Sequence, residues 1–224
     1  NGRPVIWAAQ KGGQDVFLAR PVFEVRLEGH RGGGKTAVLT MDFLREVGKG
    51  YGAEWLGILF RKTFPDLKDF IRKTKKWIPK FFPGAEYNQT SHVWTFPEGE
   101  TLTLAYMRKP DDYRNYHGSS YTWIAFEELT QWADPAMYTQ MMSCCRSPVP
   151  SIPHRYRATT NPSGPGHDWV KERFGLPILP GHIHGPVIRE ELEDNPDQYV
   201  ERVAIRVSLE QNRVLMEADP SYRA

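Results

Sequence analysis

The chain has 224 residues, of which 40% are hydrophobic and 25% are charged, a balance typical of a globular protein with a substantial core. It contains no run of about 18 apolar residues, which argues against a membrane-spanning helix. The formal net charge of +2 indicates neither an acidic nor a basic partner. Cys144 and Cys145 are adjacent, and because a disulfide between neighbours is strained, we expect two free thiols.

The hydrophobic pattern predicts strands that alternate with helices. In chain order we expect strands at 24–28, 55–60, 93–96, 101–106, 121–126 and 155–160, and helices at 36–47, 66–78, 167–174 and 196–215. We expect Pro79 to end the second helix, because proline cannot donate a backbone hydrogen bond. The strands at 93–96 and 101–106 are expected to form a hairpin. This order predicts an α/β fold with a mainly parallel sheet covered by helices on both faces, and sites in such sheets lie at the carboxyl ends of the strands.

The first motif follows the strand at 24–28 and fits the pattern G-x-x-x-x-G-K-[ST] in full. It reads Gly29-His30-Arg31-Gly32-Gly33-Gly34-Lys35-Thr36. Glycines let the backbone wrap closely around phosphates, and the N–H groups at the start of the next helix point at the anion. Lys35 is expected to reach the β- and γ-phosphates, and the Thr36 hydroxyl to ligate Mg²⁺. The motif therefore predicts a P-loop nucleotide site.

The second motif is an apolar strand that ends in two carboxylates, Trp123-Ile124-Ala125-Phe126-Glu127-Glu128. We expect Glu127 to belong to the Mg²⁺ shell and Glu128 to act as general base toward water. Alternation along a strand is expected to send the two side chains to different sides. In isolation, the two glutamates would be interpreted as a solvated strand end; the complete P-loop favours the catalytic interpretation.

A third motif, Ala158-Thr159-Thr160-Asn161-Pro162, ends the strand at 155–160 with polar side chains. These side chains can sense the γ-phosphate or hold the attacking water, and the alternative is an Asx turn before Pro162. The segment 61–80 is basic, with eight Lys or Arg and two Asp. Such a segment can follow a phosphate backbone, although charge alone favours a solvated helix face.

These three motifs, in this order, resemble the ATPase domain of the large terminase subunit of tailed bacteriophages, over most of the chain. Further segments also fit this resemblance: Gly13-Gln14-Asp15-Val16-Phe17-Leu18, Leu59-Phe60-Arg61-Lys62-Thr63, Tyr116-His117-Gly118, the stretch 161–170 and Asp194-Asn195-Pro196. The resemblance implies a RecA-like P-loop ATPase core (ASCE class) in residues 1–180 and a small lid or linker subdomain in residues 181–224. Glu127 departs from the usual pattern, in which Asp is common.

The resemblance also implies roles for single residues. ATP binding would involve Gln14, Gly29, His30, Arg31, Gly32, Gly33, Gly34, Lys35 and Thr36, with Gln14 contacting the base. Catalysis would involve Glu128, Glu127, Arg31 and Lys35, with Mg²⁺ held by Thr36 and Glu127. Thr160 and Asn161 would couple hydrolysis to motion. The family uses an arginine from a neighbouring subunit, for which Arg114 and Arg146 are the candidates.

The implied function is ATP hydrolysis that drives double-stranded DNA into a procapsid. The implied partners are DNA, further copies in a ring on the portal, and the small terminase subunit, in the cytoplasm of a bacterial host. No nuclease activity is expected, because the chain stops at Ala224, where the nuclease domain of a large terminase would begin. The alternatives are a helicase-type ATPase on single strands and, less favoured, a P-loop kinase. A GTP-dependent switch is disfavoured because the guanine motif Asn-Lys-x-Asp is missing from the sequence.

Overall fold

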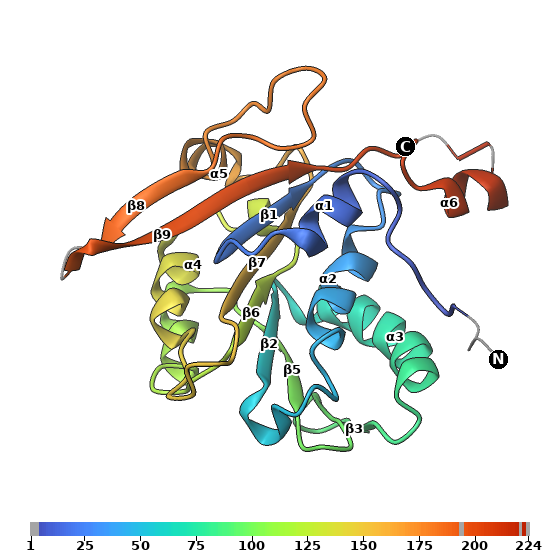
Figure 1. Ribbon diagram of the computed structural model, residues 1–224, viewed down its shortest axis with the longest axis vertical. Coiled ribbons are helices and arrows are strands. Elements are labelled where there is room, and N and C mark those ends of the chain that lie inside the picture. The colour runs from blue at the N-terminus through green and yellow to red at the C-terminus, as the bar shows by residue number, and fades with distance from the viewer. Residues whose placement is uncertain (1–4, 193–194, 220, 223–224) are drawn as a thin grey trace.

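The computed structural model describes residues 5–192, 195–219 and 221–222. These residues build one nine-stranded sheet in the order β3-β4-β5-β2-β6-β7-β1-β9-β8 (Figure 1). The strands are β1 Glu24–Glu28, β2 Leu56–Arg61, β3 Glu86–Asn88, β4 Val93–Thr95, β5 Thr101–Tyr106, β6 Trp123–Phe126, β7 Arg155–Thr160, β8 Ile188–Leu192 and β9 Asn195–Arg206. The helices are α1 Gly13–Ala19, α2 Lys35–Leu44, α3 Phe64–Phe81, α4 Ala136–Met141, α5 His167–Arg173 and α6 Arg213–Ala218.

The centre of the sheet is parallel, as predicted. Strands β5, β2, β6, β7, β1 and β9 pair in parallel, whereas β3, β4 and β8 join the two edges antiparallel. The expected hairpin is confirmed as β4 and β5. Because the central strands point the same way, the carboxyl ends of β1, β2, β6 and β7 meet at one edge of the sheet. The P-loop, the two glutamates and Asn161 directly follow the carboxyl ends of β1, β6 and β7, so parts of all three motifs lie at this edge.

Two hydrophobic clusters cover the two faces of the sheet. Neighbouring residues of one strand fall into different clusters, as with Leu59 and Ile58 on β2, because side chains alternate along a strand. Helices α1, α2 and α3 pack on the first face, and α4 and α5 on the second (Figure 1). The predicted arrangement of helices on both faces is therefore confirmed. None of the helices in the described ranges is long and apolar enough to cross a membrane.

Helix α2, which follows the P-loop, is fixed tightly to the sheet. A Cβ added to Gly57 on β2 would lie 2.4 Å from the ring of Phe43, so only glycine allows this approach. Asp42 is fully buried on the same helix and accepts hydrogen bonds from Trp123 Nε1 at 2.8 Å and Arg157 Nε at 3.0 Å. These contacts tie the helix to β6 and β7, so the P-loop has a rigid support.

The prediction of a helix at 196–215 is wrong. Most of this segment is β9, which pairs in parallel with β1 over Arg202–Arg206, and helix α6 starts only at Arg213. Val203 and Ile205 are buried against the first face of the sheet, and pairing of β-branched residues with a buried strand outweighs a helical pattern. The division at residue 180 stays a prediction; β8 and β9, which belong to its second part, extend the sheet of the first part. Asp194 lies outside the described residues.

Pro79 does not end α3, contrary to expectation. The helix continues to Phe81, and Phe82 N–H still bonds the carbonyl of Ile78 at 2.9 Å. Pro79 is exposed in the last turn, where its ring meets solvent and only one backbone hydrogen bond is lost. Thr63 caps the other end, where its hydroxyl accepts from Asp66 N–H at 3.4 Å.

Candidate active site

The P-loop wraps around the ammonium group of its own lysine. Lys35 Nζ donates to the carbonyls of Gly29 at 2.6 Å and His30 at 2.8 Å. Gly32 and Gly34 have φ angles of 86° and 76°, a left-handed conformation that other residues adopt only under strain. The loop then leads into α2, whose first N–H groups have no partner within the helix. This geometry offers a ring of donors to an anion.

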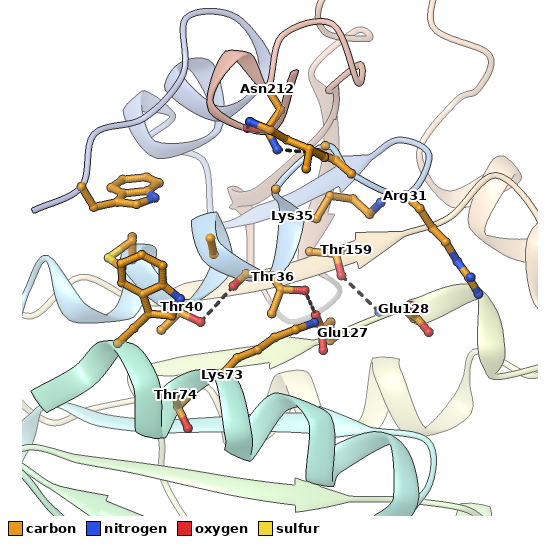
Figure 2. Close-up of a pocket in the computed structure, with 18 of the residues that line it drawn as sticks. Arg31, Lys35, Thr36, Thr40, Lys73, Thr74, Glu127, Glu128, Thr159 and Asn212 are labelled. Atoms are coloured by element: carbon orange, nitrogen blue, oxygen red, sulfur yellow. Dashed lines mark hydrogen bonds between the residues drawn. The ribbon is translucent and has the colours of Figure 1, made fainter. Parts of the chain in front are cut away.

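The carboxylate of Glu127 lies directly against the P-loop helix (Figure 2). It is 5% exposed, and its two oxygens are used separately. Oε1 accepts from the Thr36 hydroxyl, and Oε2 accepts from Arg61 Nη1 at 2.8 Å. Mg²⁺ prefers oxygen ligands, and a hydroxyl beside a carboxylate supplies two of them. The residues present therefore fit the metal role predicted for Thr36 and Glu127.

The carboxylate of Glu128 accepts hydrogen bonds from three side chains in different parts of the chain. Its Oε2 accepts from Arg61 Nη2 at 3.2 Å and Gln131 Nε2 at 2.6 Å. Its Oε1 accepts from Asn161 Nδ2 at 3.2 Å. A carboxylate held in this way has a defined direction, which a group that orients water requires.

The expectation that strand alternation sends the two glutamates to different sides is wrong, because both line one cavity and both bond Arg61. Strand β6 already ends at Phe126, and Glu128 adopts a left-handed conformation with φ 59° and ψ 52°. Its N–H donates to the Thr159 hydroxyl at 3.1 Å. Such a conformation in a non-glycine residue costs about 1–3 kcal/mol. A strained turn, rather than strand alternation, therefore sets the direction of Glu128, and its carboxylate lies near that of Glu127, since Arg61 bonds both.

Burial and charge oppose each other at this site. Burial raises the pKa of the Glu127 carboxyl, while Arg61, the Thr36 hydrogen bond and the charge of Lys73 act to lower it. Burial lowers the pKa of the Lys35 ammonium to about 8, against the attraction of Glu128 and Glu127. Two acids and several cations thus share a poorly solvated space, where each charge depends strongly on its partners.

The two residues of the predicted coupling motif have different partners. Asn161 reaches the carboxylate of Glu128, as described above. Thr160 is fully buried; its carbonyl accepts from Gly29 N–H at 3.3 Å and its hydroxyl from Arg26 at 3.2 Å. Thr160 therefore supports the loop, and its neighbour Thr159, for which no separate role was predicted, contacts the turn at Glu128.

Gln14 is 3% exposed, and both ends of its amide are engaged. Nε2 donates to the carbonyl of Gly33 at 3.0 Å, and Oε1 accepts from Gln10 N–H at 3.0 Å. In this arrangement the amide holds the P-loop. The contact with a base that the resemblance implies stays a prediction.

The remaining predicted residues lie at the surface. Arg31 is exposed and lines the cavity beside the loop, whereas the side chain of His30 is exposed over a second cavity behind it. Arg114 lies on the surface with a guanidinium nitrogen 3.8 Å from Asp111, and Arg146 donates to Ser120 at 3.1 Å. Neither of these two lines the cavity that contains the P-loop, and a role toward a neighbouring subunit stays a prediction.

A cavity of about 520 Å³ runs from the P-loop between α2 and α3. Besides the predicted residues, its lining includes Trp7, Thr40, Met41, Lys73, Thr74, Trp77, Thr159, Asn212 and Leu215. Asn212 Nδ2 donates to the carbonyl of Gly32 at 2.5 Å, and Lys73 extends from α3 toward Glu127 (Figure 2). The sequence carried no signal for Asn212, because it lies 180 positions from its partner. The basic segment could have indicated Lys73, although not its direction.

Comparisons with known proteins agree with this geometry. Residues 27–169 match the family described as terminase large subunit, T4likevirus-type, N-terminal. The fold is similar to the large terminase of a thermophilic bacteriophage, with TM-score 0.63 and 16% identity over 97% of this chain and 51% of that chain. A structure of the same large terminase in complex with ADP gives TM-score 0.58 and 16% identity over 97% and 51%. The large terminase ATPase domain of a Thermus phage gives TM-score 0.55 and 11% identity over 94% and 87%. No curated protein sequence matches the chain.

The likeness to these structures confirms the predicted P-loop fold. The chain spans about half the length of the large terminase from the thermophilic bacteriophage. The family match covers well over half of the chain and includes the P-loop, the carboxylate pair and the Thr160-Asn161 motif. The chain therefore belongs to the terminase large subunit family and contains its T4likevirus-type N-terminal domain.

Proposed function

We propose that this chain hydrolyses ATP and that hydrolysis drives double-stranded DNA into a procapsid, as the motor half of a large terminase. The single observation that supports this proposal best is the contact between the P-loop and the acidic pair. The Thr36 hydroxyl bonds Glu127, and Arg61 joins Glu127 to Glu128 within one cavity. The ADP complex of the thermophilic phage terminase supports a nucleotide as the ligand.

In the proposed reaction, the phosphates of ATP lie on the P-loop, with Lys35 near the β- and γ-phosphates. Mg²⁺, when bound by Thr36 and Glu127, supplies positive charge that stabilises the transferred phosphoryl group. Glu128 orients a water molecule, whose oxygen attacks the γ-phosphorus and whose proton passes to the carboxylate. The bond between the γ-phosphorus and the bridging oxygen breaks, and ADP and phosphate are released. Asn161 senses this change through its bond to Glu128.

The apolar part of the cavity lining suits the base of the nucleotide. It includes Trp7, Met41, Trp77 and Leu215, a set with two indole rings on which an adenine ring can stack. The P-loop lines the same cavity. Its lining therefore offers contacts for both the base and the phosphates of ATP.

Helix α3 supports DNA as a partner. Its exposed side chains include Lys68, Arg72, Lys75, Lys76 and Lys80, while its opposite face lines the nucleotide cavity through Thr74 and Trp77. A basic helix face attracts a phosphate backbone, and this attraction weakens as salt rises. The same helix thus connects the nucleotide cavity with a surface suited to DNA.

The proposal extends to the assembly. We propose that several copies form a ring on the portal with the small terminase subunit, at the procapsid in the cytoplasm of a bacterial host. Arg114 or Arg146 would then enter a neighbouring site as the trans-acting arginine. Both are exposed and away from the cavity of their own chain, which such a role requires.

ATP turnover measured without and with nucleic acid tests the proposal. We expect phosphate release without any phosphate acceptor, and stimulation by duplex DNA greater than by single-stranded DNA of equal length. Stimulation by single strands alone would favour a helicase-type ATPase. Formation of ADP only with an added acceptor, with the phosphoryl group transferred to that acceptor and not released as phosphate, would favour a P-loop kinase. Absence of phosphate release under all these conditions would overturn the proposed ATPase.

A further inference from the structure

Arg61, the last residue of β2, lies between the two acids of the site without belonging to either the P-loop or the acidic motif. It is 8% exposed. Nη1 lies 2.8 Å from Glu127 Oε2, and Nη2 lies 3.2 Å from Glu128 Oε2. Nη2 also lies 3.8 Å from Asp66 Oδ1 in the first turn of α3. One guanidinium therefore contacts both carboxylates with different nitrogens.

The planar shape of the guanidinium makes this bridge specific. Its nitrogens keep a fixed distance and direction, so two groups bonded to them are fixed relative to each other. Lysine ends in a compact point charge on a flexible stem and imposes no such geometry. Replacing Arg61 by lysine would keep the charge and lose the bridge, so the two functions of the residue can be separated by experiment.

Lys35 and Lys73 act on the two acids through their charge, but the bonds of their ammonium groups go to other partners. Lys35 donates to the loop carbonyls of Gly29 and His30, and the ammonium of Lys73 lies 2.7 Å from Asp69 Oδ2. Arg61 is therefore the cation that the described structure assigns to both acids. The strained turn at Glu128 makes such support necessary, because a left-handed residue persists only where its surroundings hold it.

We propose that Arg61 is a positioning residue, which fixes the spacing and direction of Glu127 and Glu128 for ATP hydrolysis. This inference rests on the proposed function of the same site. Arg61 acts through the two carboxylates and touches neither nucleotide nor water in this role. If the salt bridge were purely structural, its loss would lower the stability of the protein and would not lower kcat selectively over nucleotide affinity.

The test compares Arg61→Lys and Arg61→Gln with wild type, and with Arg189→Ala as a control that breaks the surface pair between Arg189 and Glu201. Misplacement of a catalytic group by about 1 Å can cost about 100-fold in rate. We expect kcat to fall about 100-fold in both Arg61 variants, while KM and the affinity for a fluorescent ADP analogue change less than about 3-fold. The Arg189 variant should match wild type. Wild-type kcat in Arg61→Lys would overturn the inference, because charge alone would then suffice.

A double-mutant cycle links the effect to Glu128. If Arg61 acts by directing this carboxylate, Arg61→Lys should lower kcat little further in a chain that already carries Glu128→Gln. A double variant whose fold-loss in kcat equals the product of the two single losses would contradict the inference.

Binding of Mn²⁺ with ADP, measured by electron paramagnetic resonance, gives a readout that does not depend on turnover. We expect a changed Mn²⁺ signal in Arg61→Lys with circular dichroism like wild type. An unchanged signal would exclude an effect on Glu127. If the wild-type chain released no phosphate, the proposed function would fail instead, so the two failures are distinguishable.

Discussion

The P-loop and the turn after β6 lie in one cavity but are built in opposite ways. The lysine of the P-loop is held by the backbone of the loop itself, since Lys35 Nζ donates to the carbonyls of Gly29 and His30. The turn at Glu128 is held by side chains from β2, from the end of β7 and from its own following residues. The position of Lys35 therefore depends on contacts that are local in sequence, whereas the position of Glu128 depends on several distant segments. Substitutions in the two regions should give different kinetic signatures.

The largest effect is expected for Glu128→Gln. The amide keeps the size of the side chain but cannot accept a proton, and loss of general-base catalysis costs about 10²–10⁴-fold. We expect kcat to fall by this amount, with the dissociation constant of an ATP analogue changed by less than about 3-fold. Phosphate release and equilibrium binding measure the two effects. Wild-type turnover would remove Glu128 from the mechanism.

Asp42→Ala tests the support that both regions share. The substitution leaves the buried guanidinium of Arg157 without its carboxylate, and breaking a buried ion pair costs about 3–5 kcal/mol. We expect the free energy of unfolding in urea to fall by about this amount. Asp111→Ala, at an exposed pair with Arg114, is the control and should leave the unfolding midpoint unchanged. Equal stability of the two variants would mean that α2 is not anchored through Asp42.

Lys35→Ala should affect binding, in contrast to Glu128→Gln. Hydrogen bonds that involve a charged group contribute about 1.5–3 kcal/mol, so the dissociation constant of ATP should rise roughly 10- to 100-fold. Calorimetric titration with an ATP analogue measures this change. An unchanged dissociation constant would contradict the assignment of the P-loop.

The smallest effect is expected for Asn212→Ala. This substitution removes one hydrogen bond to the Gly32 carbonyl, worth about 1 kcal/mol. We expect ATP affinity to fall by about 5-fold at saturating Mg²⁺, with an unchanged turnover rate. Equilibrium binding and phosphate release separate the two quantities. If turnover instead fell by two orders of magnitude, Asn212 would join the hydrolytic region and the contrast between the two regions would weaken.

The sequence predicted well wherever short-range chemistry decides structure. The glycines and Lys35 of residues 29–36 specify the turns of the loop and its lysine contacts, which are local in sequence. The apolar composition of residues 123–126 indicates that this strand is buried. Alternating strands and helices were sufficient to predict a parallel sheet covered on both faces. The prediction of a helix at 196–215 was wrong because β9 is a strand through its pairing with β1 and β8.

Amino-acid order alone determined the P-loop, the acidic pair and the family, because each depends on residues within a few positions of one another. Only the tertiary structure decided what surrounds them. It brought Arg61 to both glutamates, placed Thr159 rather than Thr160 at the turn of Glu128, and placed Asn212 on the P-loop. These partners lie 31 to 180 positions apart. Such contacts arise from the register of the strands and the packing of the helices, which no local pattern encodes.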